Sequence, residues 1–387
     1  MIDRHISVAI PAMDELETLP LTLADLQRQR YRDFSVHICV NQPDSWWSDG
    51  DAGHQAVCRR NASLIQWLQD GVEGLEIHVM DCSSPGCGWS GKQHGVGQAR
   101  KRLFDAVSSE AVSEAGLLVS LDADTRIDAD YLRRLVSTFD ACPSPDAVAA
   151  PYYHRLTGDE VVDRPLLRYE CYMRHYLLQL LRIGSPYAFT ALGSAMAFTC
   201  RAYRRAGGMA PLQGGEDFYL MQKFAKTGHI ALRLQGGTGA DEVLVFPSGR
   251  VSRRVPFGTG PAVAMQPAGQ AVRYPFFAPS GFDAVAETYS LFPTLYERDV
   301  ETPMSAFLRR QLATGDLWGP LRRNHTSPQR FVRACRERVD GLRILQYLRS
   351  RPDGILPDCA LADFTNETLS RLDDFRNTLL RQEMMLR

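Results

Sequence analysis

The chain of 387 residues has no long apolar segment, no paired cysteine pattern and almost no net charge. No apolar run approaches the roughly 18 residues that a membrane-spanning helix needs, which excludes a spanning segment. The N-terminus leads directly into a strand-like run, so we expect no signal peptide. The formal net charge of −1 gives no overall field that would attract nucleic acid, which excludes nucleic acid as an expected partner.

Lysine is scarce, since 40 of the 44 basic residues are arginine, and we attribute this bias to genome composition. The nine cysteines are scattered through the chain, and several, such as Cys39 and Cys200, sit in apolar stretches. This usage predicts reduced core thiols and a cytoplasmic protein.

Hydrophobic residues make up 44% of the chain and charged residues 23%, which is typical of an ordinary globular protein. Strand and helix signals alternate in the first half, which favours a mostly parallel sheet covered by helices. Strands are expected over residues 6–10, 34–40, 75–80, 117–122, 147–151 and 195–199. Helices are expected over residues 14–29, 56–69, 96–107, 166–183, 214–224 and 331–348. Residues 247–270 are expected to form a loop, and the composition becomes helical from about residue 276.

An acidic pair ends the apolar run 117–121, since Asp122 and Asp124 follow it two residues apart. If the chain stays extended there, side chains at i and i+2 point to the same side of the strand. Ligands bind at that edge of α/β sheets, and two carboxylates suit Mg²⁺ or Mn²⁺ held jointly with a substrate diphosphate. The alternative is a plain strand-to-helix turn in which Asp124 or Thr125 caps the next helix.

A second acidic pair, Glu216 and Asp217, follows Gly214 and Gly215 where a helix should begin. Acids at a helix N-terminus are stabilised by the helix dipole, so a purely structural role is the alternative. The same field is expected to keep Asp217 ionised at neutral pH. An ionised carboxylate can take a proton from an attacking hydroxyl as a general base.

Residues 86–93 nearly match a phosphate-binding loop, but Gln93 stands where that motif needs a magnesium-binding hydroxyl. Lys92, Arg100 and the backbone amides near residue 95 are candidates to offset diphosphate charge. A solvated glycine-rich loop is the alternative.

Two further groups of side chains are candidates for substrate contact. Arginines in the loop over 247–270 are candidates to close on phosphate, with a solvated loop as the alternative: these are Arg250, Arg253 and Arg254. Aromatic side chains are candidates to stack on a sugar, with core packing as the alternative: these are Tyr152, Tyr153, Tyr169 and Tyr172, near His154.

Taken in order, these motifs resemble those of family 2 glycosyltransferases with the GT-A fold. Residues 7–15 are similar to the family's VIIPxYNE strand and turn, with Met and Asp in place of Tyr and Asn. Residues 95–101 resemble its GxxxARN segment, and Asp122-Ala123-Asp124 matches its DXD motif. Residues 193–209 resemble the acceptor-side stretch that ends in GGF, and Glu216-Asp217 matches the ED motif. The resemblance covers residues 5–260, with a longer segment than usual after the second strand.

This resemblance implies a GT-A domain over residues 1–275, with a mixed, mostly parallel sheet flanked by helices, and a helical extension over 276–387. It implies a metal-dependent, inverting hexosyl transfer from a nucleotide-diphosphate sugar to a hydroxyl of a carbohydrate or lipid-linked acceptor. Cell-envelope polysaccharide or glycolipid synthesis is the setting suggested by family analogy.

The resemblance also implies roles for particular residues. Asp124 would hold Mn²⁺ or Mg²⁺ against the diphosphate, and Asp122 would share the metal or contact the ribose. Asp217, with Glu216 beside it, would deprotonate the acceptor. Contacts with the base, ribose or diphosphate are implied for Pro11, Ala12, Asp14, Asn41, Asp81, Arg100 and Arg254.

The C-terminal part has no recognised motif. Between Met304 and Arg351 there are eleven arginines against three acids. We hypothesise that this region touches an anionic bilayer at the inner membrane face, or a lipid-linked acceptor. Solvated helix faces or an oligomer contact are the alternative.

Two rival functions belong to other classes. A sugar-phosphate nucleotidyltransferase should carry its phosphate loop just after the first strand, where residues 11–15 of this chain contain no glycine. A non-catalytic nucleotide-sugar-binding protein is disfavoured because both acidic motifs are intact.

Overall fold

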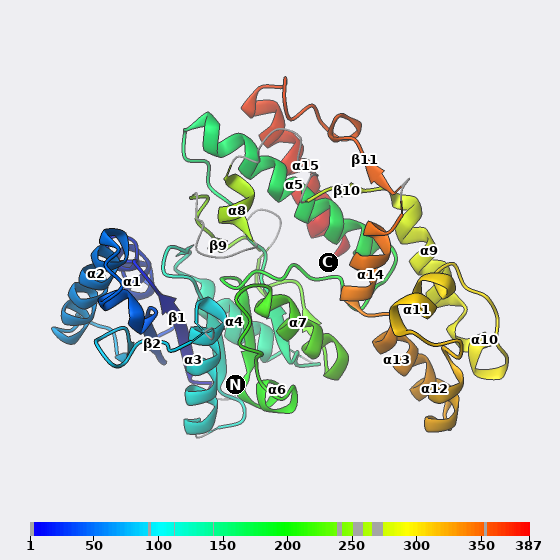
Figure 1. Ribbon diagram of the computed structural model, residues 1–387, viewed down its shortest axis with the longest axis horizontal. Coiled ribbons are helices and arrows are strands. Elements are labelled where there is room, and N and C mark those ends of the chain that lie inside the picture. Colours follow the sequence, from blue (N-terminus) through cyan, green and yellow to red (C-terminus); the bar gives the residue numbers. More distant parts are fainter. Residues whose placement is uncertain are drawn as a thin grey trace. The chain divides into compact units, whose positions relative to one another are not determined.

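The computed structural model of the protein describes residues 4–91, 94–111, 113–141, 143–237, 242–250, 258–264, 274–351 and 354–387. The chain forms two compact units, and Figure 1 shows their elements. Unit 1 comprises Met1–Leu166 and Phe189–Gln266, and unit 2 comprises Leu167–Ala188 and Pro267–Arg387. Residues 167–188, which the sequence placed in the first domain, therefore belong to the second unit.

Unit 1 is built on a seven-stranded mixed sheet with the order β3-β2-β1-β4-β7-β6-β8. The pairs β1–β2, β2–β3, β1–β4 and β6–β8 are parallel, whereas β4–β7 and β6–β7 are antiparallel. These strands are β1 (Ile6–Ala12), β2 (Phe34–Asn41), β3 (Ile77–Cys82), β4 (Leu117–Ser120), β6 (Ala147–Ala149), β7 (Met196–Thr199) and β8 (Ile230–Ala231). A separate antiparallel pair joins β5 (Arg126–Ile127) to β9 (Val245–Phe246). The predicted mixed, mostly parallel sheet is confirmed.

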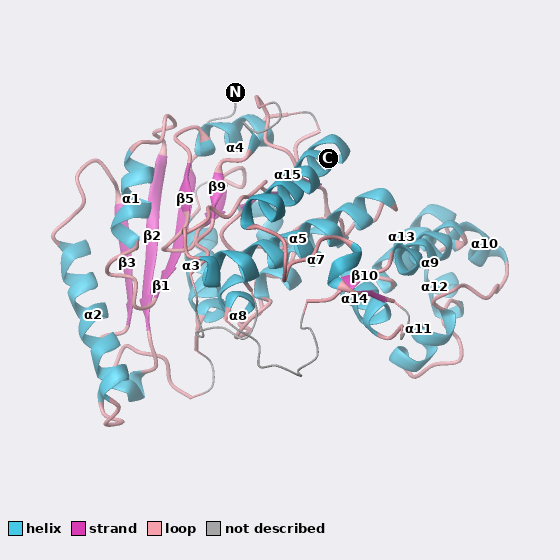
Figure 2. Ribbon diagram, turned by 90° about the horizontal axis from the view of Figure 1, so that it is seen from above, coloured by secondary structure: helices cyan, strands magenta, loops and turns pink. Residues whose placement is uncertain are grey.

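Strand β1 lies between β2 and β4 and is buried at every position. A parallel strand covered on both faces needs a continuous apolar run, which is the pattern the sequence shows there. Figure 2 shows α1 and α2 on one side of β1–β3 and α3 on the other. This arrangement follows from right-handed crossovers, because the chain moves outward from β1 to β3 and then returns to β4.

The helices of unit 1 are α1 (Leu19–Gln27), α2 (Ala52–Gln69), α3 (Val96–Glu110), α4 (Tyr131–Phe139), α6 (Cys200–Arg205), α7 (Glu216–Thr227) and α8 (Thr259–Val263), with the 3₁₀ turn η1 (Asp44–Trp47). Helix α1 begins later than the predicted residue 14. Asp14 has φ of +63°, a left-handed conformation that cannot continue a right-handed helix. The short helix α8 lies in the segment expected to be a loop.

Unit 2 is mostly helical, as expected from residue 276 onward. Helix α5 (Glu160–Arg182) begins in unit 1 and supplies residues 167–182 to unit 2. The other elements are α9 (Pro279–Ser290), α10 (Phe292–Glu297), α11 (Ser305–Leu312), α12 (Gly319–Asn324), α13 (Pro328–Arg338), α14 (Gly341–Arg349), α15 (Leu369–Leu386), η3 (Asp358–Ala360) and the antiparallel pair β10 (Phe276–Phe277) and β11 (Ile355–Leu356). Among the described helices, none is both long and apolar enough to cross a membrane.

The single helix predicted over residues 331–348 is two helices, α13 and α14. The break comes at Asp340, whose carboxylate accepts a hydrogen bond from the backbone N–H of Arg343. This contact caps the N-terminus of α14, so the aspartate starts a new helix instead of continuing the old one. A periodic apolar pattern does not reveal such a break.

Candidate active site

Asp122 and Asp124 lie in a tight turn after β4, not on an extended strand. The strand ends at Ser120, and the backbone N–H of Thr125 donates to the carbonyl oxygen of Asp122 at 3.1 Å. The prediction that both carboxylates share one strand face is therefore wrong. The capping alternative is also wrong, because the next helix begins only at Tyr131.

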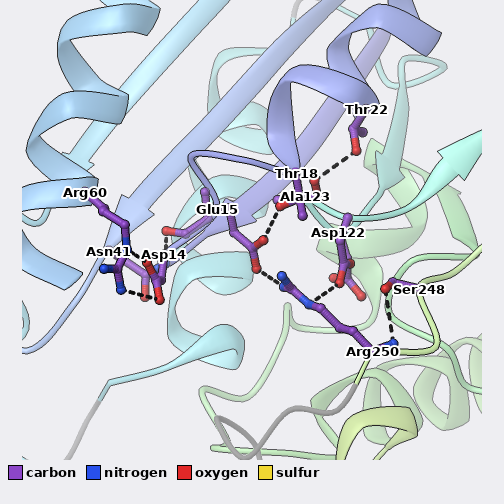
Figure 3. Close-up of polar contacts among 12 residues, drawn as sticks. Asp14, Glu15, Thr18, Thr22, Asn41, Arg60, Asp122, Ala123, Ser248 and Arg250 are labelled. Carbon is purple, nitrogen blue, oxygen red and sulfur yellow. Dashed lines mark hydrogen bonds and ion pairs between the residues drawn. The ribbon is translucent and has the colours of Figure 1, made fainter. Parts of the chain in front are cut away.

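Helix α1 holds this acidic turn from one side. The hydroxyl of Thr22 contacts the carbonyl oxygens of Ala123 at 2.9 Å and Thr125 at 3.1 Å, and Thr22 is completely buried. Figure 3 shows Thr22 on its helix with its hydroxyl directed at the turn. The two acids thus project from a backbone fixed by a neighbouring element.

Arg100 joins the two acidic motifs. Its guanidinium, on α3, forms ion pairs with Asp122 and with Glu216 at the start of α7. Arg100 is 3% exposed and Glu216 is 2% exposed, so the Arg100–Glu216 pair is almost fully withdrawn from water. The structure therefore brings together two motifs that are distant in the sequence.

The guanidinium of Arg100 lies directly against the backbone at Gly193. A Cβ atom at this position would overlap the guanidinium, so glycine is needed for the approach. Burial alone would lower the pKa of Arg100, but Asp122, Glu216 and Asp217 raise it overall. Arg100, which was expected to bind a diphosphate, pairs with protein carboxylates in this structure.

Asp217 lies in the first turn of α7, where the sequence predicts it. Gly215 precedes the helix with φ of +76°, a conformation that favours glycine. Burial and the neighbouring Glu216 raise the pKa of Asp217 to about 7, although Arg100 opposes this shift. Burial and the like charge of Glu216 thus act against the helix dipole, which was expected to keep Asp217 ionised at neutral pH.

Arg250 connects the acidic turn to the loop after β1. Its guanidinium pairs with Glu15, and its Nε lies 2.7 Å from Oδ2 of Asp124. Figure 3 shows the side chain of Arg250 reaching between Glu15 and the turn. Arg254, Arg253, Lys92 and Gln93 lie outside the described residues.

On the expected nucleotide side, the amide of Asn41 is occupied by protein partners. It donates to the carbonyl oxygens of Ala12 at 3.0 Å and Cys39 at 3.3 Å, and it accepts from the indole of Trp89 at 3.2 Å. Pro11 and Ala12 are the last two residues of β1 and are buried. These contacts tie the ends of β1 and β2 to the glycine-rich segment.

Asp14 and Asp81 are also held by neighbouring groups. The carboxylate of Asp14 pairs with the guanidinium of Arg60 through two hydrogen bonds, and its backbone N–H donates to Asn61 at 2.9 Å. The carboxylate of Asp81 accepts hydrogen bonds from the backbone N–H groups of Ser83 and Ser84, each at 2.9 Å. Burial would raise the pKa of Asp81, but these serine contacts lower it overall.

The aromatic candidates fit core packing. Tyr152 is 1% exposed and His154 is completely buried, with Nε2 at 3.3 Å from the hydroxyl of Thr259. Tyr169 and Tyr172 are buried in unit 2, where their rings stack with centroids 6.4 Å apart.

The donor set around the acidic turn fits a divalent cation only in part. No cluster of three or more His, Cys, Asp or Glu side chains able to hold a metal occurs among the described residues. The side chains of Asp122 and Asp124 are 37% and 17% exposed. Mg²⁺ is commonly bound by one or two carboxylates together with substrate phosphates. The two aspartates therefore fit a metal site that the substrate completes.

Three residues of this arrangement were not identified from sequence. Glu15 and Gly193 belong to quoted motifs but received no role of their own, and Thr22 carries no chemical signal. Their importance depends on which carbonyl, guanidinium or carboxylate the fold places beside them.

No protein-family model matches the chain, and no curated protein sequence matches it. Among solved structures, the fold is similar to S. aureus TarS 1-349 in complex with UDP-GlcNAc, with a TM-score of 0.43 and 13% identity, over 99% of this chain and 90% of that chain. It is also similar to mannosyltransferase PcManGT from Pyrobaculum calidifontis in complex with GDP-Man and Mn²⁺, with a TM-score of 0.38 and 18% identity, over 87% and 88% of the two chains.

A third similar structure is glucosyl-3-phosphoglycerate synthase from Mycobacterium tuberculosis, with a TM-score of 0.34 and 18% identity, over 59% and 69% of the two chains. At such low identities and TM-scores, the likeness assigns no activity to this chain.

Proposed function

We propose that the protein is a glycosyltransferase that moves a sugar from a nucleotide-diphosphate donor to an acceptor hydroxyl, with inversion at the anomeric carbon and with Mn²⁺ or Mg²⁺. The observation that supports it best is Arg100, whose buried guanidinium joins Asp122 of one acidic motif to Glu216 of the other. This link supports the proposal because it connects Asp122 to the residue next to Asp217.

In this mechanism Asp217 is the general base. An acceptor hydroxyl transfers its proton to a carboxylate oxygen of Asp217 while its oxygen attacks the anomeric carbon. The bond from that carbon to the diphosphate oxygen breaks, and the nucleoside diphosphate leaves with the electron pair. Attack opposite to the leaving group inverts the configuration.

Asp122 and Asp124 would hold the divalent cation, which acts as a Lewis acid toward the diphosphate. Arg100 orients Asp122 and Glu216 through the two ion pairs. Arg250, beside Asp124, offers a further cation to the departing diphosphate. Pro11, Ala12, Asp14, Asn41 and Asp81 shape the end of the sheet at which we place the nucleoside, and a carbohydrate or lipid-linked alcohol is the proposed acceptor.

The test combines binding with turnover. We expect UDP or GDP to raise the unfolding temperature when Mn²⁺ is present, and the matching nucleotide sugar to release free nucleoside diphosphate. Asp124→Ala should abolish transfer, and Asp217→Asn should reduce it by about 10²–10⁴-fold, while circular dichroism shows that each variant is folded. Asp70→Asn, at the exposed end of α2, is the matched control and should keep full activity.

Other outcomes point to the rival functions. Activity that requires a nucleoside triphosphate and a sugar phosphate, with release of pyrophosphate, would indicate a nucleotidyltransferase. Nucleotide-sugar binding with no release of nucleoside diphosphate would indicate a binding protein. Full activity in Asp217→Asn would remove this residue as the base.

A further inference from the structure

Glu15 is a buried acid to which the proposed transfer assigns no role. It lies in the loop between β1 and α1 and is 6% exposed. One carboxylate oxygen accepts a hydrogen bond from the hydroxyl of Thr18, and the other pairs with the guanidinium of Arg250. Burying a carboxylate without partners costs free energy, so these two contacts hold the side chain in place.

The partner that Glu15 shares with the candidate site is Arg250. The same guanidinium lies 2.7 Å, through Nε, from Oδ2 of Asp124. A carboxylate oxygen that accepts a hydrogen bond from guanidinium has fewer lone pairs for a metal, and a fixed positive charge beside it repels a divalent cation. In this arrangement the guanidinium of Arg250 is a counter-ion of Asp124.

The two acids that pair with Arg250 differ in their exposure to water. The side chain of Glu15 is 7% exposed, and that of Asp124 is 17% exposed. Losing the guanidinium costs Glu15 more, because water cannot replace the partner there as easily. Asp124 can exchange its partner for a metal ion at lower cost.

We propose that Glu15 is a positioning residue that anchors Arg250, and that Arg250 is a built-in counter-ion of Asp124 which a divalent cation must displace. Glu15 then keeps the displaced guanidinium beside the site, where its planar fork suits a phosphate. This inference rests on the proposed function, since it assumes that Asp124 binds the metal.

The test measures the binding of Mn²⁺ without nucleotide. The electron paramagnetic resonance signal of the free ion reports how much Mn²⁺ remains unbound. Arg250→Gln should bind Mn²⁺ about tenfold more tightly than the wild type, since the variant removes a cation that competes for Asp124; tenfold corresponds to about 1.4 kcal/mol. Glu15→Gln should bind Mn²⁺ about three- to tenfold more weakly. Of the two acids that pair with Arg250, Asp124 alone then keeps its charge, so Arg250 competes with the metal more strongly. A merely structural role would weaken binding in both variants.

The double variant separates anchoring from simple charge. If Glu15 acts through Arg250, adding Glu15→Gln to Arg250→Gln should leave the Mn²⁺ affinity of Arg250→Gln unchanged. Additive effects would show that Glu15 acts by its own charge and would overturn the proposal. Arg30→Gln and Glu17→Gln, both at exposed positions of unit 1, are matched controls for charge and should not change the affinity.

Arg250 is half-buried, so Arg250→Gln tests the idea even if Glu15→Gln does not fold. Unchanged or weaker Mn²⁺ binding in folded Arg250→Gln would overturn the proposal. If the wild type still binds UDP or GDP with Mn²⁺ in that case, the transferase function stands. Suppose instead that Arg250→Gln binds Mn²⁺ more tightly but the protein binds no nucleotide. The counter-ion role of Arg250 would then be supported, and the proposed transferase function would be rejected.

Discussion

Asp217 combines a position and an acidity that suit proton removal. A base works best when its pKa lies near the operating pH, and burial together with Glu216 raises the pKa of Asp217 to about 7. Only the ionised form accepts a proton, so its active fraction falls tenfold for each pH unit below that value. We therefore predict that kcat/KM rises with unit slope up to about pH 7 and is level above it.

The control for this pH profile is Asp217→Asn. General-base catalysis typically contributes about 10²–10⁴-fold, so the variant should lose that much activity. Its residual activity should show no inflection near pH 7. A wild-type inflection near pH 4, the ordinary range of an aspartate, would contradict the assignment.

Gly193 is the second residue whose replacement should be informative. A Cβ atom there overlaps the guanidinium of Arg100 and must push it away from Asp122 and Glu216. Misplacing catalytic groups by about 1 Å can cost about 10²-fold in rate. We predict such a loss for Gly193→Ala in a folded protein, measured as nucleoside diphosphate release.

Gly315→Ala is the matched control, because a Cβ atom there meets nothing within 4 Å. Its rate and unfolding temperature should equal those of the wild type. Normal turnover by Gly193→Ala would mean that Arg100 need not hold both acids at once.

At the scale of elements, α1 determines where the acidic turn lies. The hydroxyl of Thr22 contacts two turn carbonyls, and on the same helix Asp25 pairs with Arg126 of β5. Thr22→Val keeps the shape of the side chain but removes the hydroxyl, which leaves buried carbonyls without that donor. We predict a loss of about 1–3 kcal/mol in unfolding free energy, together with weaker Mn²⁺ binding.

Denaturant unfolding and Mn²⁺ titration check this prediction. Thr138→Val, whose hydroxyl bonds the carbonyl of Arg134 within α4, is a control for a buried threonine outside the turn. It should lose stability without losing Mn²⁺ affinity. Equal Mn²⁺ affinity in both variants would show that Thr22 does not position the acids.

The sequence correctly predicted several elements whose buried apolar side chains recur at regular intervals. Strands β1 and β2 and helix α7 are found where expected, because periodic apolar side chains determine them locally. The start of α1 was not predicted, since it depends on the left-handed backbone of Asp14. The turn at Asp122 was not predicted either, since its geometry depends on Thr22, about a hundred residues away.

The candidate site was predicted as a set of residue types, not as a set of contacts. Asp122, Asp124, Glu216 and Asp217 were singled out because acids at element ends are chemically distinctive. Their pairing with Arg100 and Arg250 follows from tertiary packing, which no local pattern encodes. For the same reason the raised pKa of Asp217 was not expected.

At the scale of the whole molecule, the small net charge of −1 combines two units of opposite sign. Unit 2 contains 20 arginines, no lysine and 16 acids, for a formal charge of +4. Unit 1, which holds the acidic candidate site, therefore has a formal charge of −5. The basic character of unit 2 is confined to residues 304–351, which carry +8, because the rest of the unit has 9 arginines and 13 acids and carries −4.

Ion pairs reduce the charge that this basic region offers to a partner. Among the described residues, several of its arginines pair with acids: Arg309 with Glu301, Arg322 with Asp299, Arg323 with Asp316, Arg333 with Glu337, and Arg343 with Asp340. Apart from the pair of Arg343 with the buried Asp340, these pairs are at least partly exposed, and such pairs are weak and compete poorly with a dense layer of anionic headgroups. We therefore expect part of the positive charge of residues 304–351 to remain accessible to an anionic surface, although less than the sequence count suggests.

We predict that the full chain sediments with vesicles rich in anionic lipid at about 0.01 M salt, where the Debye length is about 30 Å. Binding should be lost near 1 M salt, where the Debye length is about 3 Å, and should be absent with neutral vesicles. Arg310→Gln combined with Arg330→Gln removes two charges from unit 2 and should weaken sedimentation, whereas Arg30→Gln with Arg59→Gln, in unit 1, should not. No sedimentation with anionic vesicles at low salt would remove the membrane contact and leave an oligomer contact or a solvated surface as the role of the basic helices.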